Sequence, residues 1–283
     1  MSVILLISII LGVAFQNVAK KPYTLKAEGK GAYFFCLLTS LAAMLFFIIT
    51  SGGFEWNSGL LIYAFFFAVS YATTTVFGFE AIACGPLSLS SLVISYSLML
   101  PALYGLVFLK DPISIGFIPG LVLLVISLFL INQKNEKAPI TFKWVIFVIL
   151  AFLGNGICSI VQNMQQVKFE GAYKNEFMIV ALAMVSLILC FFVFIKERKD
   201  IKAVAKFAYI PAIACGLVNG AVNLFVMMLS NGMMAVSLMF PLISAGGIII
   251  TYVVSRFIYK ETLTKLQFIG FVIGIASIVL LNI

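Results

Sequence analysis

Two stretches of this chain, 150 residues apart, decide its fold. Residues 109–132 read LKDPISIGFIPGLVLLVISLFLIN, and residues 259–282 read YKETLTKLQFIGFVIGIASIVLLN. At this constant offset a Lys–acid turn, a glycine, a serine and a final Leu-x-Asn coincide without a gap. The charged turn and the ungapped register count for most, because chance matches between apolar runs are common. We therefore expect two homologous halves, residues 1–132 and 143–283.

The composition is typical of a membrane protein. Of the 283 residues, 63% are hydrophobic and only 10% are charged, whereas a soluble domain carries about 25% charged residues. Too little polar surface remains to cover a water-facing globule, which excludes a soluble enzyme. The chain has no histidine, and its five cysteines stand singly in apolar runs, so neither a metal site nor an imidazole-dependent triad is expected. We expect no catalytic residues, no metal and no cofactor.

Ten apolar runs are long enough to cross a bilayer, which takes roughly 20 residues per helix. They cover residues 3–19, 31–50, 58–80, 86–109, 113–132, 143–163, 177–195, 207–229, 233–257 and 264–282. Charged and helix-breaking residues separate them, as in Lys20–Lys30 with Pro22 and in Gly85-Pro86. The sequence predicts an all-α integral membrane fold of ten transmembrane helices with no soluble domain. The first helix lacks signal-peptide features, and we expect it to be retained.

Five helices per half is an odd number, so the second half starts on the opposite face of the membrane from the first. The two five-helix repeats are then inverted, related by a two-fold axis in the membrane plane. Inverted repeats recur in secondary transporters, whose binding sites lie near the midplane where the repeats meet.

Two stretches resemble a known transporter family. They run from Gly85-Pro86-Leu87-Ser88 to Lys110-Asp111 and from Ala235-Val236-Ser237 to Lys260-Glu261. With its ten helices, the chain resembles the EamA-like branch of the drug/metabolite transporter superfamily. The resemblance implies a central cavity lined by the first four helices of each half, with the fifth and tenth helices at the periphery. The chain departs from the family in its charges, since Ser51–Ser58 holds no Lys or Arg and Lys20–Lys30 holds four.

Polar side chains within the apolar runs are the candidates for a binding site, because a polar group in hydrocarbon is costly unless it meets a partner or a wet cavity. The candidate substrate-binding residues are Gln16, Tyr71, Thr75, Ser91, Ser95, Asn155, Gln162, Asn219, Asn223, Ser237 and Ser244. For the serines and threonines, a bond to their own i−4 carbonyl or to a neighbouring helix is a competing interpretation. An Asn or Gln amide is harder to satisfy within one helix, which favours a cavity lining over a structural contact between helices.

No carboxylate lies in the middle of a predicted span. Glu80, Glu176 and Arg256 stand at helix ends, where solvation or a local ion pair is expected. Small multidrug exporters of the same superfamily carry a proton-coupling Glu in the first helix, whereas this first helix offers Gln16, which does not titrate. We therefore expect uniport or solute exchange.

Positive charge is distributed unevenly over the connections. Those after the first, third, fifth, seventh and ninth runs hold 15 of the 18 Lys and Arg residues. Because positive loops stay cytoplasmic, both termini should lie outside, although the related transporters usually have both inside. This placement in loops also argues against nucleic acid as a partner.

Small residues in the last run of each half point to close helix packing. Gly116-x-x-x-Gly120 and Gly270-x-x-x-Gly274 let a neighbouring helix approach closely. Packing within one chain is the favoured interpretation, and a homodimer through these peripheral helices is the alternative.

Together these features predict a secondary transporter in the plasma or inner membrane that moves a small organic metabolite or drug-like solute by alternating access. Amides and hydroxyls without buried charge favour an uncharged, zwitterionic or weakly charged solute. The alternative is a flippase for a lipid or lipid precursor. A membrane enzyme and a scaffold that transports nothing have no supporting feature in the sequence.

Overall fold

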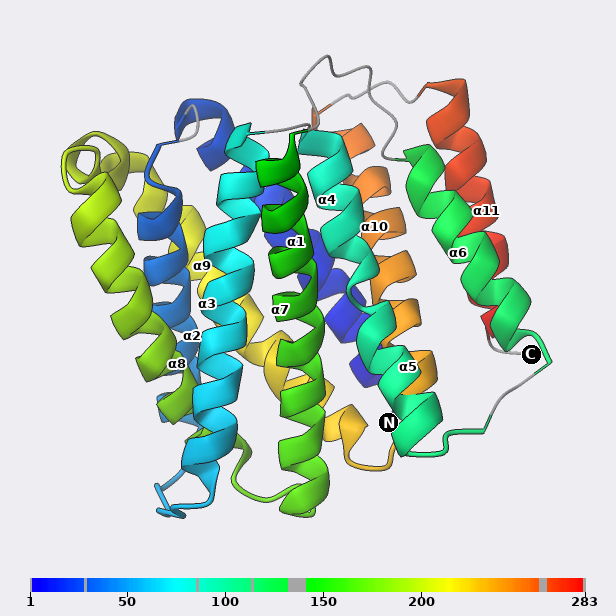
Figure 1. Ribbon diagram of the computed structural model, residues 1–283, viewed down its shortest axis with the longest axis horizontal. Helices are drawn as coiled ribbons and strands as arrows, with labels where there is room; N and C mark the ends of the chain where they lie inside the picture. Colours follow the sequence, from blue (N-terminus) through cyan, green and yellow to red (C-terminus); the bar gives the residue numbers. More distant parts are fainter. Residues whose placement is uncertain are drawn as a thin grey trace.

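The computed structural model describes residues 2–27, 30–84, 87–112, 115–131, 141–259 and 264–281, and every regular element in them is a helix (Figure 1). The α-helices are α1 (Ser2–Ala27), α2 (Ala32–Thr50), α3 (Leu60–Cys84), α4 (Leu87–Tyr96), α5 (Met99–Phe108), α6 (Phe117–Ile131), α7 (Phe142–Lys168), α8 (Lys174–Phe192), α9 (Ile201–Ser230), α10 (Val236–Tyr259) and α11 (Lys265–Leu281), and a π-helix, η1 (Val193–Glu197), extends α8. Six of the described helices are long and apolar enough to cross a membrane, and four apolar helices are shorter. These helices indicate a helical membrane protein.

The first helix is longer than the sequence predicts. The apolar run predicts a helix that ends before the charged linker, but α1 continues through Pro22. The Tyr23 hydroxyl in the added turns donates to the carbonyls of Lys30 and Gly31 at 2.8 and 2.6 Å. The Tyr23 ring also stacks on Phe35, with ring centroids 4.4 Å apart. These contacts hold the end of α1 against the start of α2.

The fourth apolar run, 86–109, is predicted as one helix, but a turn at Ser97 and Leu98 divides it into α4 and α5. Pro101 accounts for the break, because it lacks the N–H that would bond to the Ser97 carbonyl. That carbonyl accepts instead from the Leu100 N–H at 3.0 Å. The wall of the bundle therefore contains a helix break near its middle.

The long helices pack in pairs that join early and late parts of the chain. α1 lies against α9 and α10, α2 against α8 and α9, and α3 against α7 and α8. A glycine permits the close approach of α7 to α3: a Cβ at Gly154 of α7 would lie 2.7 Å from Thr74 Oγ1 and 2.8 Å from the Ser70 carbonyl oxygen of α3. These pairs bring the centres of α1, α3, α7 and α9 together.

α6 and α11 form a pair at one edge of the bundle (Figure 1). Ser127 Oγ donates to the Gly270 carbonyl at 2.7 Å, and Ser277 Oγ donates to the Gly120 carbonyl at 2.8 Å. A Cβ at Gly116 would overlap a backbone carbonyl of α11. Each small-residue motif thus packs against the other helix of the pair within the chain, as the favoured interpretation expects.

Two carboxylates bond to the starts of helices from distant parts of the chain. Glu197, only 6% exposed, accepts from the Tyr33 and Phe34 N–H groups of α2 at 3.0 and 2.8 Å. Asp111 accepts from the Ser237 N–H of α10 at 2.8 Å. The first N–H groups of a helix have no partner within it, and negative charge is favourable there. Each carboxylate therefore fastens one helix to another segment.

Both chain ends lie at one end of the bundle, and the α1–α2 and α8–α9 connections lie at the other (Figure 1). Residues 20–30 and 196–206, at these two connections, hold nine Lys and Arg residues. The two ends of the molecule therefore differ in charge.

Candidate functional site

A cavity of about 220 Å³ lies between α1, α3, α7 and α9. Its lining consists of Val13 and Gln16 from α1, Phe67 and Tyr71 from α3, Asn155, Cys158, Ser159 and Gln162 from α7, and Asn219, Val222 and Asn223 from α9. These residues lie in the central turns of four long helices. The cavity is therefore at mid-depth in the bundle.

The structure brings six of the sequence-predicted binding residues together in this cavity. They are Gln16, Tyr71, Asn155, Gln162, Asn219 and Asn223. The sequence prediction missed Val13, Phe67, Cys158 and Val222, whose apolar side chains look like any other residue of a membrane span. Ser159 was not a candidate either, although it follows Asn155 by four residues and shares its helix face.

Four lining amides form a continuous hydrogen-bonded chain. Gln162 Nε2 donates to Asn223 Oδ1 at 3.2 Å, and Asn223 Nδ2 donates to Asn219 Oδ1 at 3.0 Å. Asn219 Nδ2 donates to Gln16 Oε1 at 3.1 Å, and Gln16 Nε2 reaches the Gly12 carbonyl at 3.4 Å. These hydrogen-bonded amides, the amide chain, run from α7 through α9 to α1 and join the three helices along the cavity wall.

This amide chain retains capacity to bind a ligand. A side-chain amide oxygen can accept two hydrogen bonds, and those of Asn223, Asn219 and Gln16 each accept one within the chain. None of the cavity-lining side chains carries a formal charge. The cavity therefore offers neutral hydrogen-bonding groups.

An aromatic wall adds an apolar surface to the same cavity. Phe67 and Tyr71 of α3 stack with ring centroids 6.0 Å apart and an interplanar angle of 22°. A ligand in the cavity meets both this wall and the amide chain. That combination suits a small molecule with a polar edge and an apolar body.

Asn155 connects the cavity to the break between α4 and α5. Its Nδ2 donates to Ser97 Oγ at 2.6 Å. The same serine carries the carbonyl that Pro101 leaves without its helical donor. A cavity residue is thus bonded directly to a discontinuity in the neighbouring helix.

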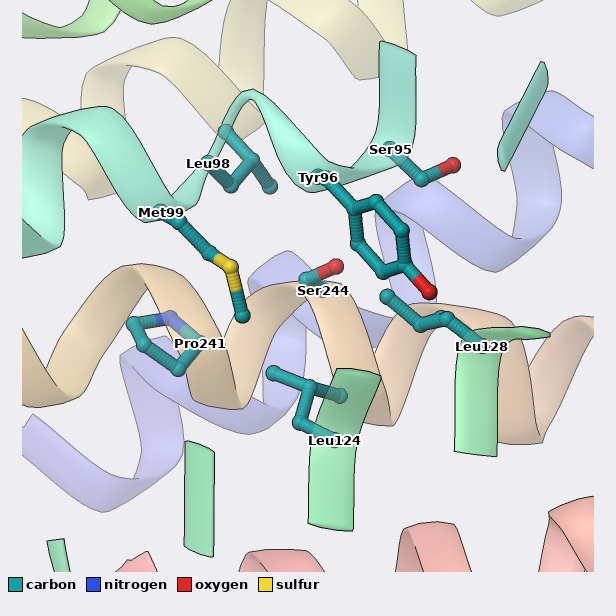
Figure 2. Close-up of a pocket in the computed structure, with 8 residues that line it drawn as sticks. All are labelled: Ser95, Tyr96, Leu98, Met99, Leu124, Leu128, Pro241 and Ser244. Carbon is teal, nitrogen blue, oxygen red and sulfur yellow. The ribbon is translucent and has the colours of Figure 1, made fainter. Parts of the chain in front are cut away.

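Four of the other five sequence-predicted residues lie elsewhere. Ser95 and Ser244 line a second, smaller pocket where α4 and α5 face α6 and α10, beside Pro241 and Met99 (Figure 2). This pocket is too narrow to admit a water molecule. Thr75 donates to its own i−4 carbonyl at 2.9 Å, as the competing interpretation holds.

Ser237 is not among the residues that line the cavity. Ser237 is buried at the start of α10, where its N–H bonds to Asp111. The side chain of Ser91 lies outside the described residues.

The charged residues at helix ends include one ion pair. Glu80 of α3 pairs with Lys196 of η1 and accepts from the Tyr33 hydroxyl at 3.1 Å. Glu176 is half-buried in the first turn of α8, and the side chain of Arg256 lies outside the described residues. A local ion pair at Glu80 is confirmed.

In the described part of the chain, no group of three His, Cys, Asp or Glu side chains is placed to hold a metal ion.

No protein-family model and no curated protein matches the sequence. A solved structure described as "Crystal structure of protein" is similar in fold, with a TM-score of 0.77 over 99% of this chain and 95% of that chain. The two sequences are 12% identical, so this similarity bears on the fold alone.

Proposed function

We propose that this protein is a secondary transporter of the EamA-like branch of the drug/metabolite transporter superfamily, located in the plasma or inner membrane. It moves a small organic solute by alternating access around the cavity between α1, α3, α7 and α9. The observation that carries the proposal is the uncharged amide chain at mid-depth, joining helices from both halves of the sequence. Transporter binding sites lie at this depth, where repeats meet.

The helix packing supports an inverted repeat. Suppose that α1–α6 form one half and α7–α11 the equivalent half. The two-fold axis then converts the contact between α1 and α9 into the contact between α7 and α3, and it leaves the contact between α6 and α11 unchanged. The two hydrogen bonds of the α6–α11 pair are equivalent in the same way. At the offset of 150, Ser127 corresponds to Ser277 and Gly120 to Gly270, so the bond from Ser127 to Gly270 corresponds to the bond from Ser277 to Gly120. Both features agree with two homologous halves.

The lining favours an uncharged or zwitterionic solute. Neutral amides bind hydroxyl, carbonyl and amine groups, and the stacked Phe67 and Tyr71 rings suit an apolar body. The volume of about 220 Å³ is below that of pockets for drug-sized ligands, roughly 300–1,000 Å³. These features support a small metabolite rather than a lipid chain.

Ligand binding to the purified protein tests this proposal. A thermal-shift screen of amino acids, nucleosides, sugars and quaternary amines identifies a solute that raises Tm, because a ligand that binds only the folded state stabilises it. Loss of a neutral hydrogen bond together with a stranded partner costs about 1–3 kcal/mol. Gln162→Ala and Asn223→Ala should therefore weaken the Kd of that solute about 5- to 100-fold.

Ser277→Ala is the control, since Ser277 bonds to Gly120 at the edge of the bundle, away from the cavity. Its Kd should equal that of the unmodified protein. Equal affinities in all three variants would mean that the amides only join helices and that the solute binds elsewhere.

A further inference from the structure

The end of α7 contains an unusual density of buried amides. Residues 162–166 read Gln-Asn-Met-Gln-Gln, and the four amide side chains are 4%, 1%, 0% and 0% exposed. Met164, in the middle of the run, is 40% exposed on the outer surface of the bundle. In a membrane protein, buried polar side chains mark a partner or a pathway for polar substances.

Two of these amides are bonded to other parts of the protein. Gln162 bonds to Asn223 in the cavity wall. Gln165 Nε2 donates to the Ala172 carbonyl at 3.2 Å, and its oxygen accepts from Gln166 Nε2. These contacts account for Gln162 and Gln165 as parts of the helix packing.

Asn163 is different. Within the described part of the chain, neither its Nδ2 nor its Oδ1 has a hydrogen-bond partner, and Gln166 Oε1 has none either. Buried polar atoms in folded proteins are nearly always paired with protein or with ordered water. Asn163 and Gln166 therefore offer two acceptors and one donor group to something other than the surrounding side chains.

Helix geometry relates these two residues to the cavity. Asn163 follows Ser159 by four residues, and Gln166 follows Gln162 by four, so each lies about 6 Å further along the helix on a face that lines the cavity. From the cavity, α7 runs toward the end of the bundle at which both chain ends lie (Figure 1). The unpaired amides therefore lie between the cavity and that end.

We propose that Asn163 and Gln166 form a second polar site on the pathway between the cavity and the end of the bundle that carries both termini. The site binds uncharged hydrogen-bonding groups, either of water or of the solute in transit, because both residues offer only neutral amide atoms. Being nearly inaccessible in this structure, it is reached when the pathway opens on that side. This inference rests on the proposed transport function.

Thiol labelling of the protein in proteoliposomes tests whether water reaches the site. The reactive form of cysteine is the thiolate, which forms where water is present and not against lipid. Asn163→Cys should therefore react with trimethylammonium-ethyl methanethiosulfonate at least about 10-fold faster than Met164→Cys, the matched control on the exposed, apolar side of the helix. Because the native Cys158 also lies on α7 and lines the cavity, both variants carry Cys158→Ala, and mass spectrometry of the α7 peptide then reports the introduced thiol alone. Equal, slow labelling of both variants would overturn the proposal.

Thermal stability gives a second, independent readout. Replacing an unpaired buried amide with an apolar side chain removes a desolvation penalty, so Asn163→Leu should raise Tm by about 2 °C. Gln165→Leu breaks two bonds and should lower Tm. A decrease for Asn163→Leu like that for Gln165→Leu would show that Asn163 is a paired structural residue and would overturn the proposal.

Labelling also separates the two sources of the ligand and the two proposals. Fast labelling without added solute shows that water occupies the site. If an amino acid, nucleoside, sugar or quaternary amine that raises Tm also slows the labelling, the solute itself occupies the site as well. Fast labelling of Asn163→Cys in a protein that binds and moves none of these solutes supports the hydrated site and contradicts the transport function.

Discussion

At the scale of single residues, Glu197 shows how a buried charge stabilises this membrane protein. The carboxylate closes the end of η1 onto the start of α2, where Gly31 offers no side chain to the free N–H groups. Hydrogen bonds to a charged acceptor are stronger than neutral ones, and the helix dipole adds to them. Glu197 thus fastens α8 to α2 at the basic end of the bundle.

Substitution of Glu197 should lower stability measurably. Glu197→Gln removes the charge and one of the two acceptor oxygens, and we expect a loss of about 1–3 kcal/mol in the free energy of unfolding. Thermal unfolding in detergent measures this loss as a lower Tm. Glu55→Gln, in the exposed α2–α3 connection, is the control and should leave Tm unchanged. An unchanged Tm for both variants would contradict the capping role.

The sequence predicts some of these residues and not others, for physical reasons. Asn219 and Asn223 could be predicted because an amide inside a membrane span requires a partner. Thr75 gave the same signal, but its hydroxyl bonds to its own helix, an option that hydroxyls have and long amides lack. Glu197 gave no signal, because its role depends on where η1 meets α2, a contact between residues far apart in the sequence.

At the scale of helices, the α6–α11 pair depends on small residues. Its two reciprocal serine–carbonyl bonds need a close approach of the backbones. Gly116 lies at this contact, where a Cβ would overlap the Leu280 carbonyl. A larger residue there must push the two helices apart.

Gly116→Val should therefore destabilise the pair. Overpacking of this kind costs about 1–3 kcal/mol, which lowers Tm in detergent by a few degrees. Gly53→Val is the matched control, since a Cβ at Gly53 meets no atom within 4 Å. The close packing would be refuted if the two valine variants had the same Tm.

The positions of the helices follow closely from apolar run length, because the hydrocarbon core demands about 20 residues per span. Nine of the ten predicted runs correspond to one helical segment each, although α1 is longer than expected. The break at Ser97 could not be predicted from hydropathy, because the run stays apolar through it. Pro101 was its only sequence signal, and a proline also occurs inside α9 at Pro211 without a break.

At the scale of the whole molecule, the charge difference between the two ends predicts the orientation in the membrane. Segments 20–30 and 196–206 lie at the end opposite the termini and carry nine basic residues. Positive segments stay in the cytoplasm. Residue counts alone predict this asymmetry, whereas the cavity follows only from the packing of helices that are far apart in the sequence.

We therefore expect both termini to lie outside the cytoplasm. An alkaline phosphatase fused to the C-terminus, active only outside, should be active, and a green fluorescent protein fused there should be dark. Moving basic residues from 196–206 to the α7–α8 connection should reduce the phosphatase signal. A fluorescent C-terminal fusion with an inactive phosphatase would show that the family orientation prevails over the charge rule.

The central claim is that the cavity between α1, α3, α7 and α9 is where a solute crosses the membrane. Solute counterflow into proteoliposomes tests it most directly, using the solute that raises Tm and comparing the unmodified protein with Asn219→Leu and Thr75→Ala. Asn219→Leu breaks the amide chain in its middle, whereas Thr75 bonds only to its own helix among the described contacts. We predict counterflow by the unmodified protein, an unchanged rate for Thr75→Ala and a rate at least about 10-fold lower for Asn219→Leu. Equal rates in all three proteins, or no counterflow in any of them, would contradict the account.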